Sequence, residues 1–431
     1  MIIEFSCSNM LSFKENVTLS FVPGKEKLNA YRLSVVKKLK FKVNPLAVLF
    51  GPNASGKTNF IKNLAFVKRL VLKQPVKDSL IGVTPFLFDA NSKSIPSMFA
   101  LSFLAQNDDV YTLNVELNNQ EILFEELTLR NSADKRVLYT RKKDKIDFNL
   151  IGSKDDIKSS ILTLVKSNLE KNRLFLNSAG LIVINSFKEL RNAYSWFERL
   201  TIVSPDTNFL AMLSKFIDIS KIAQLLQSFG IDVDSIDLMD YPPDNLPQPL
   251  QRQLDNLPQN QNFCALINKK DFVIANIENG EKRLRKLSTL HKINDNVTVR
   301  LDLGEESDGT KRLIELFPIL FALNQDDDHN AVYVIDELDR SLHTLLTRAI
   351  IKNFMTSRYE DSRKQLIFTC HDALLFDDEC LRTDQMVIFD KARGYTQATK
   401  MNEIEGVRNG RDLVKLYLSG QLGGVPKIKT I

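Results

Sequence analysis

Hydrophobic and polar residues alternate on either side of a short polar loop near the start of the chain. Residues 2–5 and 17–22 flank the loop at 8–15. A period of two predicts strands, so this segment is expected to form a β-hairpin. Residues 35–43 predict a third, basic strand, and the apolar run at 45–50 predicts a buried one.

A helical period follows and is then replaced by strands. The spacing predicts a helix that opens at residue 59 and runs to about Leu72, before Pro75. Short alternating runs between residues 83 and 150 predict an antiparallel β-subdomain. Residues 155–240 return to a period of 3.6 and predict a helical insertion.

The last third of the chain begins with a boundary. Prolines, glutamines and asparagines gather at residues 240–262, which predicts a loop. Strand-type runs then return at 272–275, 297–301, 331–335, 365–368 and 386–389. Helices are expected between most of the later strands, as in a βαβ sheet.

The composition is that of a soluble globular protein. With 431 residues and 43% hydrophobic residues, the chain is long enough for about two to three domains. The longest apolar run, 313–323, is interrupted by Glu315 and Pro318, so no membrane span is expected. The first residues lack the basic start of a signal peptide, and we expect a cytoplasmic protein.

Cysteine and charge add little to the picture. The four cysteines are scattered and form no C-x-x-C pair, so neither a disulfide framework nor a zinc site is indicated. The net charge is +5, with basic clusters at 37–40 and 141–143. Such clusters are either solvated faces or contacts to nucleic acid, which leaves DNA open as a partner.

One stretch carries a specific chemical signal. It reads Gly51, Pro52, Asn53, Ala54, Ser55, Gly56, Lys57, Thr58, Asn59 and fits G-x-x-x-x-G-K-[ST] between a predicted strand and a predicted helix. The glycines allow positive φ and close approach to an anion, and the loop N–H groups face it. The alternative is a glycine-rich turn that matches by accident.

This phosphate loop, residues 51–58, predicts a nucleotide site. Lys57 is expected to reach the β- and γ-phosphates of ATP. Thr58 is expected to hold Mg²⁺ with its hydroxyl. Asn53 and Asn59 are candidates for further polar contacts.

Two later strands end in chemically useful residues. The apolar run 332–335 is followed by Asp336 and Glu337, which suggests a metal ligand beside a residue that orients or deprotonates water. The run 365–368 leads to His371, for which a role next to the γ-phosphate competes with a structural one.

A fourth segment is ambiguous on its own. Ser307 and Gly309 lie just before the apolar helix predicted at 313–323. Ser307 is either a plain helix N-cap or part of a second anion site at that helix terminus.

The order of these motifs resembles the ABC-type ATPase heads of the SMC, RecF and OLD kind. A narrower resemblance is to the stand-alone AbiL/RloA-type AAA-family ATPases of bacterial abortive-infection systems. It rests on residues 2–5 with 12–13, 85–86, 306–310, 336–343 and 417–426. His343 departs from the Asp that many ABC heads have there, Asp308 interrupts the Ser-Gly-Gly signature, and no Q-loop glutamine can be assigned.

The resemblance implies an ATPase that forms a homodimer or higher homo-oligomer on ATP, with Ser307 and Gly309 of one subunit closing on nucleotide held by the other. It implies regulation of a separate effector, of the nuclease-like or the Toprim-like kind, in response to a phage trigger. The implied fold is an α/β P-loop NTPase, an ABC-type head. We expect an N-terminal ATPase lobe (1–80), an antiparallel β-subdomain (81–154), a helical insertion (155–262) and a C-terminal ATPase lobe (263–431).

Other functions fit less well. Residues 268–271 match the guanine-reading [NT]-K-x-D pattern, but no D-x-x-G precedes them after the phosphate loop. A transporter subunit is disfavoured by the long insertion. A RecF- or SMC-like repair or chromosome ATPase is the main alternative, although no sustained heptad pattern runs through 155–240. A sensor that binds ATP without hydrolysing it is a third class.

Overall fold

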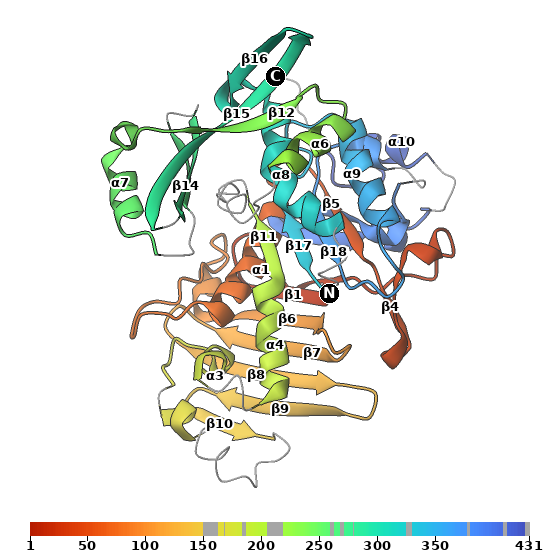
Figure 1. The fold of residues 1–431 in the computed structure, drawn as a ribbon. Helices are drawn as coiled ribbons and strands as arrows, with labels where there is room; N and C mark the ends of the chain where they lie inside the picture. Colours follow the sequence, from red (N-terminus) through yellow and green to blue (C-terminus); the bar gives the residue numbers. More distant parts are fainter. Residues whose placement is uncertain are drawn as a thin grey trace. The chain divides into compact units, whose positions relative to one another are not determined.

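The computed structural model describes residues 1–149, 163–167, 169–182, 187–204, 219–258, 263–267, 271–278, 280–324, 330–376, 380–407 and 412–426. The chain divides into two compact units. The first comprises Met1–Ser204, Asp326–Leu338 and Ser357–Ile431, and the second comprises Pro205–Gln325 and Asp339–Thr356. Figure 1 shows the elements of both units, which are described separately below.

A six-stranded sheet forms the centre of the first unit. Its order is β11 (Leu200–Val203), β17 (Val332–Ile335), β18 (Gln365–Thr369), β5 (Leu46–Phe50), β19 (Met386–Ala392) and β20 (Tyr395–Lys400). Every pair is parallel except β19 and β20. All residues of β5, β17 and β18 are buried, which explains why β5 and β17 read as continuous apolar runs and β18 has an apolar centre between Gln365 and Thr369.

The first unit also contains a seven-stranded antiparallel sheet. Its order is β10 (Lys145–Phe148), β9 (Lys135–Lys142), β8 (Ile122–Arg130), β7 (Val110–Leu117), β6 (Ser97–Leu104), β1 (Ile2–Ser8) and β2 (Val17–Ser20). The predicted hairpin and antiparallel sheet are therefore present. They form one sheet, because β1 pairs with β6. The β-subdomain thus includes strands from the segment 1–80 as well as from 81–154.

The helix α1 (Lys57–Leu72) packs its apolar side into the core that both sheets share. The helices α3 (Phe175–Ile182) and α4 (Lys188–Arg199) contact it. In Figure 1, α4 crosses the strands of the antiparallel sheet. Trp196 of α4 stacks on Phe103 of β6, with 4.3 Å between ring centroids. We therefore assign Trp196 to the core of this unit.

The segment expected to form one helical insertion, 155–262, is divided between the two units. Its described part contributes α3, α4 and the sheet strand β11 to the first unit. The β11 strand was not distinguished from its helical surroundings because it has four residues, too few for a clear period.

Two local predictions were wrong. Residues 35–43 form a tight hairpin of β3 (Ser34–Val36) and β4 (Phe41–Val43), because Lys40 adopts a left-handed conformation with φ 55° that breaks a continuous strand. The expected loop at 240–262 contains the helix α7 (Gln248–Asp255). Proline is tolerated in the first turn of a helix, where its missing N–H costs no hydrogen bond.

The second unit has its own antiparallel sheet, made of β12 (Ser235–Asp240), β13 (Phe263–Ile267), β14 (Asp271–Glu278), β15 (Glu281–Asn294) and β16 (Val297–Asp302). Its helices include α6 (Ser220–Ser228), α8 (Asp308–Asn324) and α9 (Thr344–Thr356). The strands predicted at 272–275 and 297–301 belong to this sheet. None of the described helices is both long and apolar enough to span a membrane.

Candidate functional site

Three neighbouring parallel strands of the first unit end at one edge of the sheet. β18 pairs with β17 on one side and with β5 on the other. The phosphate loop follows β5, Asp336 and Glu337 follow β17, and His371 comes shortly after β18. Because the carboxyl ends of parallel strands share an edge, the fold brings these distant groups together.

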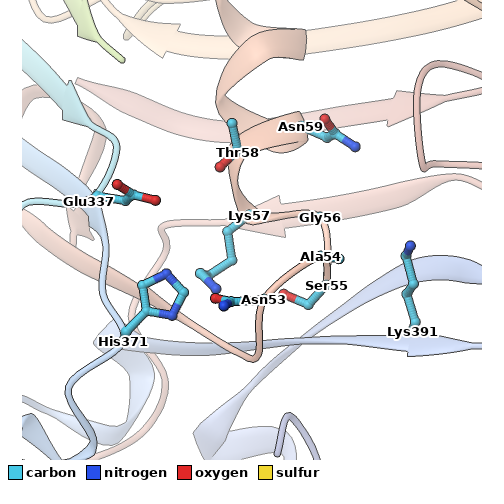
Figure 2. A pocket seen from close by; sticks show the side chains of 10 residues that line it. All are labelled: Asn53, Ala54, Ser55, Gly56, Lys57, Thr58, Asn59, Glu337, His371 and Lys391. Carbon is cyan, nitrogen blue, oxygen red and sulfur yellow. The ribbon is translucent and has the colours of Figure 1, made fainter. Parts of the chain in front are cut away.

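A pocket of about 420 Å³ opens at this edge (Figure 2). Its lining consists of Asn53, Ala54, Ser55, Gly56, Lys57, Thr58, Asn59, Glu337, His371 and Lys391. Figure 2 shows Glu337 and His371 on one side of the phosphate loop and Lys391 on the other. All of these residues except Lys391 are candidates from the sequence.

The glycines of the phosphate loop are required by backbone conformation and by packing. Gly51 has φ 145° and Gly56 has φ 111°. A Cβ atom would lie 2.3 Å from the carbonyl oxygen of Phe389 at the first position and 2.1 Å from Oγ1 of Thr396 at the second. The loop is therefore pressed against β19 and β20, which leaves its opposite side to face the pocket.

Lys57 is the buried cation of the site. Its side chain lines the pocket although the residue is only 6% exposed. Its Nζ donates to the carbonyl oxygens of Gly51 and Pro52, at 2.5 and 3.1 Å. These contacts hold the ammonium over the loop, where it can meet the phosphates of a nucleotide.

Asp336 and Glu337 occupy different positions at the end of β17. Asp336 is 1% exposed, and its Oδ1 accepts a hydrogen bond of 2.7 Å from the Thr369 hydroxyl. Glu337 has a left-handed backbone with φ 53°, and its side chain lines the pocket. Figure 2 shows the Thr58 hydroxyl and the Glu337 carboxylate on the same side of the pocket.

The residues present fit a magnesium ion. Oδ2 of Asp336 is buried and has no hydrogen-bond partner among the described residues. A buried carboxylate oxygen without a donor is costly, and a cation that prefers oxygen ligands would satisfy it. The Thr58 residue lines the pocket, and its sharing of one ion with Asp336 stays a prediction.

Ser307 and Gly309 belong to the second unit and do not line the pocket. Oγ of Ser307 accepts a 3.1 Å hydrogen bond from the Thr310 N–H, so its predicted capping role is confirmed. A Cβ on Gly309 would lie 3.1 Å from the carbonyl oxygen of Ser341, which makes this a position of close backbone approach. Any contact of these residues with nucleotide stays a prediction.

Two other candidates have structural contacts. The Asn59 amide donates to Oγ of Ser12 at 2.8 Å and so ties α1 to the loop between β1 and β2. His343 accepts a 3.2 Å hydrogen bond from the Leu345 N–H at the start of α9. In this chain His343 therefore serves as a helix cap.

Sequence reasoning missed Lys391 and Thr369. Lys391 is an exposed residue of β19, and its only signal was a basic side chain two positions after the apolar run 386–389. Thr369 is a hydroxyl at the end of β18, a strand that was read only for its apolar residues and for His371. Neither position belongs to a motif of fixed spacing.

A family model described as "AAA domain, putative AbiEii toxin, Type IV TA system" matches residues 46–377, well over half of the chain. The chain belongs to this AAA-domain family. The matched range includes the phosphate loop, both acids and His371. The AAA-family ATPase of the abortive-infection kind predicted from the sequence is thus confirmed at the level of the family, whose description names AbiEii where the sequence suggested AbiL and RloA.

The AAA-domain chain is also similar to several solved structures. It is 13% identical to the SMC head domain from Thermotoga maritima, with a TM-score of 0.37 and 93% of this chain and 98% of that chain covered. For an SMC head bound to the C-winged helix domain of ScpA, the identity is 12%, the TM-score 0.40 and the coverage 92% and 97%. The ATP-bound recombination mediator RecF is 11% identical to this chain, with a TM-score of 0.36 and with 93% of this chain and 99% of that chain covered. None of the curated proteins compared with the chain matches it.

Proposed function

We propose that this AAA-domain protein binds ATP with Mg²⁺ and hydrolyses it to ADP and phosphate. The observation that supports this most strongly is that Lys57, Glu337 and His371, which come from three separate parts of the chain, line the same pocket. A buried cation, an acid and an imidazole around a loop of backbone N–H groups are the parts that phosphoryl transfer to water requires.

Each group has a distinct role in the proposed reaction. Lys57 holds the β- and γ-phosphates, and Glu337 accepts a proton from the attacking water. His371 positions the γ-phosphate or that water. Thr58 and Asp336 would hold Mg²⁺, which supplies charge neutralisation between the phosphates.

The enzyme assignment is tested by measuring ATP turnover and its loss when a single side-chain atom is replaced. We expect Mg²⁺-dependent phosphate release from ATP by the wild type and none by Glu337→Gln, which keeps the size of the side chain and removes its basicity. Tight ATP binding without turnover in the wild type would instead make the protein a nucleotide-dependent sensor.

We further propose that it works as an ABC-type ATPase, in which two copies enclose the nucleotide. Ser307 and Gly309 of a second copy would then face the phosphates held by the first. Support comes from the place of Ser307, an exposed residue at the N-terminus of the 17-residue helix α8, which is a position that favours an anion.

Mixed dimers test this arrangement. Lys57→Ala and Ser307→Arg should each be inactive alone, because both sites of each homodimer are damaged. In the mixed dimer one site carries both lesions and the other carries none, so hydrolysis should reappear. The matched control is Lys57→Ala with Glu337→Gln, which should restore nothing, because both residues serve the same copy's nucleotide. Failure of the first pair in confirmed mixed dimers would reduce Ser307 to a helix cap.

For the biological role, we propose a sensor that regulates a separate effector, nuclease-like or Toprim-like, in anti-phage defence. Support comes from the family description, which names a putative AbiEii toxin and a Type IV TA system. Cells carrying the gene with its neighbours should resist phage, and Lys57→Ala or Glu337→Gln should abolish that resistance. Sensitivity to DNA damage without any change in phage resistance would favour the repair ATPase instead.

A further inference from the structure

One hydroxyl group contacts both acidic residues that follow β17. Oγ1 of Thr369 donates to Oδ1 of Asp336 at 2.7 Å and accepts from the backbone N–H of Glu337 at 2.6 Å. Thr369 is fully buried and is the last residue of β18. It therefore joins the ends of two neighbouring strands at the edge where the pocket opens.

The bond to Asp336 determines which carboxylate oxygen is available. With Oδ1 engaged by Thr369, the buried Oδ2 is the oxygen without a partner among the described residues. A hydroxyl that fixes the carboxylate in this way acts as the outer-shell partner of a metal ligand.

The hydrogen bond that the Glu337 N–H donates to Thr369 affects the backbone conformation of Glu337. A residue other than glycine in a left-handed conformation costs roughly 1 kcal/mol or more. Glu337 adopts this conformation, and the hydrogen bond from its N–H to Thr369 is one contact that holds it there. The conformation aims the Glu337 side chain at the pocket, which it lines.

We propose that Thr369 is a positioning residue that sets the metal-binding carboxylate of Asp336 and the catalytic carboxylate of Glu337 at the same time. The inference rests on the proposed function. Because Thr369 is followed closely by His371, the end of β18 carries both the hydroxyl that contacts the two acidic residues and the imidazole that lines the pocket with Glu337.

Valine and serine substitutions separate this role from packing. Thr369→Val keeps the shape and removes the hydroxyl, so Oδ1 of Asp336 loses its donor. We expect kcat to fall about 10- to 100-fold and more Mg²⁺ to be required, with the KM for ATP changed by less than about 3-fold. Thr369→Ser keeps the hydroxyl and should restore most of the activity even if it packs less well.

A matched control is Thr347→Val. Thr347 is also fully buried, but its hydroxyl has no hydrogen-bond partner among the described residues. This variant should leave kcat and the Mg²⁺ requirement unchanged. Circular dichroism and thermal unfolding of all three variants identify any loss of fold.

A binding measurement separates this inference from the proposed function. Mn²⁺ affinity in the presence of ADP, followed by electron paramagnetic resonance, should weaken in Thr369→Val and recover in Thr369→Ser. Wild-type turnover together with unchanged kcat and Mn²⁺ affinity in folded Thr369→Val would overturn the role of Thr369 alone. Absence of wild-type turnover would overturn the hydrolysis proposal, while weakened Mn²⁺ binding in Thr369→Val would still support the positioning of Asp336.

Discussion

The hydroxyl of Thr396 donates a 2.8 Å hydrogen bond to the carbonyl oxygen of Ser55 and thereby joins β20 to the phosphate loop. The backbone N–H of Thr396 also donates to the carbonyl oxygen of Ser12, at 2.9 Å. The back of the loop is thus closed by a strand that sequence motifs did not mark. This contact fixes how much room exists at Gly56.

We predict that Gly56→Ala disrupts the site. Its Cβ would meet Oγ1 of Thr396 at 2.1 Å, in a backbone with φ 111°. Overpacking and strain together should cost about 2–4 kcal/mol, and ATP binding should be lost. The control is Gly394→Ala, with φ 88° and nothing within 4 Å, which should cost about 1 kcal/mol and keep affinity. Thermal unfolding measures the loss of stability, and calorimetric titration measures the affinity for ATP. Equal losses in Gly56→Ala and Gly394→Ala would contradict the steric argument.

The two lysines of the pocket should differ in importance. Lys57→Ala removes a buried cation held over the phosphate loop and should weaken ATP binding by roughly 100-fold. Lys391→Ala removes an exposed cation from the pocket wall and should weaken binding by about 5-fold. Only the loss of affinity in Lys391→Ala should become smaller at high salt, because exposed charges are screened. Calorimetric titration of both variants with ATP at low and high salt measures these affinities.

Glu337→Gln should bind ATP and stop before hydrolysis. If closure of two copies depends on the γ-phosphate, this variant should accumulate as a dimer in ATP and remain monomeric in ADP. Light scattering coupled to size exclusion measures the mass directly. Identical profiles in both nucleotides would argue against ATP-dependent dimerisation while leaving the hydrolysis assignment intact.

His371→Ala should lower kcat more than nucleotide affinity. The side chain lines the pocket beside Glu337, so its proposed contact is with the γ-phosphate or the attacking water and not with the part of ATP that ADP shares. We expect about a 10- to 100-fold loss of turnover with ADP affinity unchanged. Weaker ADP binding at an unchanged kcat would assign His371 a structural role.

A pH dependence is expected in the second unit. Burial disfavours charge on His291, but the 2.7 Å hydrogen bond to Glu306 and its negative charge outweigh this, and Asp232 adds to them, so the pKa of His291 is raised above 6.5. The folded state then binds the proton more tightly than the unfolded state. The resulting stabilisation is complete below about pH 6.5 and is lost as the pH rises through the raised pKa.

The size of this effect is at most about 1 kcal/mol, because the pair is partly open to solvent. Thermal unfolding between pH 6 and 9, compared with His291→Gln, isolates it. The difference in stability between the two proteins should shrink as the pH increases. A constant difference across this range would show that His291 contributes through packing alone.

The sequence by itself determined the local parts of the site. The phosphate loop between β5 and α1 could be placed because its glycines, lysine and threonine have fixed spacing and lie between a strand and a helix. Asp336, Glu337 and His371 could be placed at or near strand ends because apolar runs at 332–335 and 366–368 precede them. These signals depend on neighbours in the chain, where periodicity and motif spacing are informative.

Tertiary structure decided the rest, because strand pairing and side-chain hydrogen bonds join residues that are distant in sequence. Only the fold pairs β11 with β17 and β1 with β6, and only the fold places Thr396 against Gly56. The contact of Thr369 with Asp336 spans 33 residues, and no local pattern encodes it. A hydroxyl at the end of a buried strand looks the same in sequence whether it faces a carboxylate or an apolar neighbour, and the order of strands in the sheet determines which of these it meets.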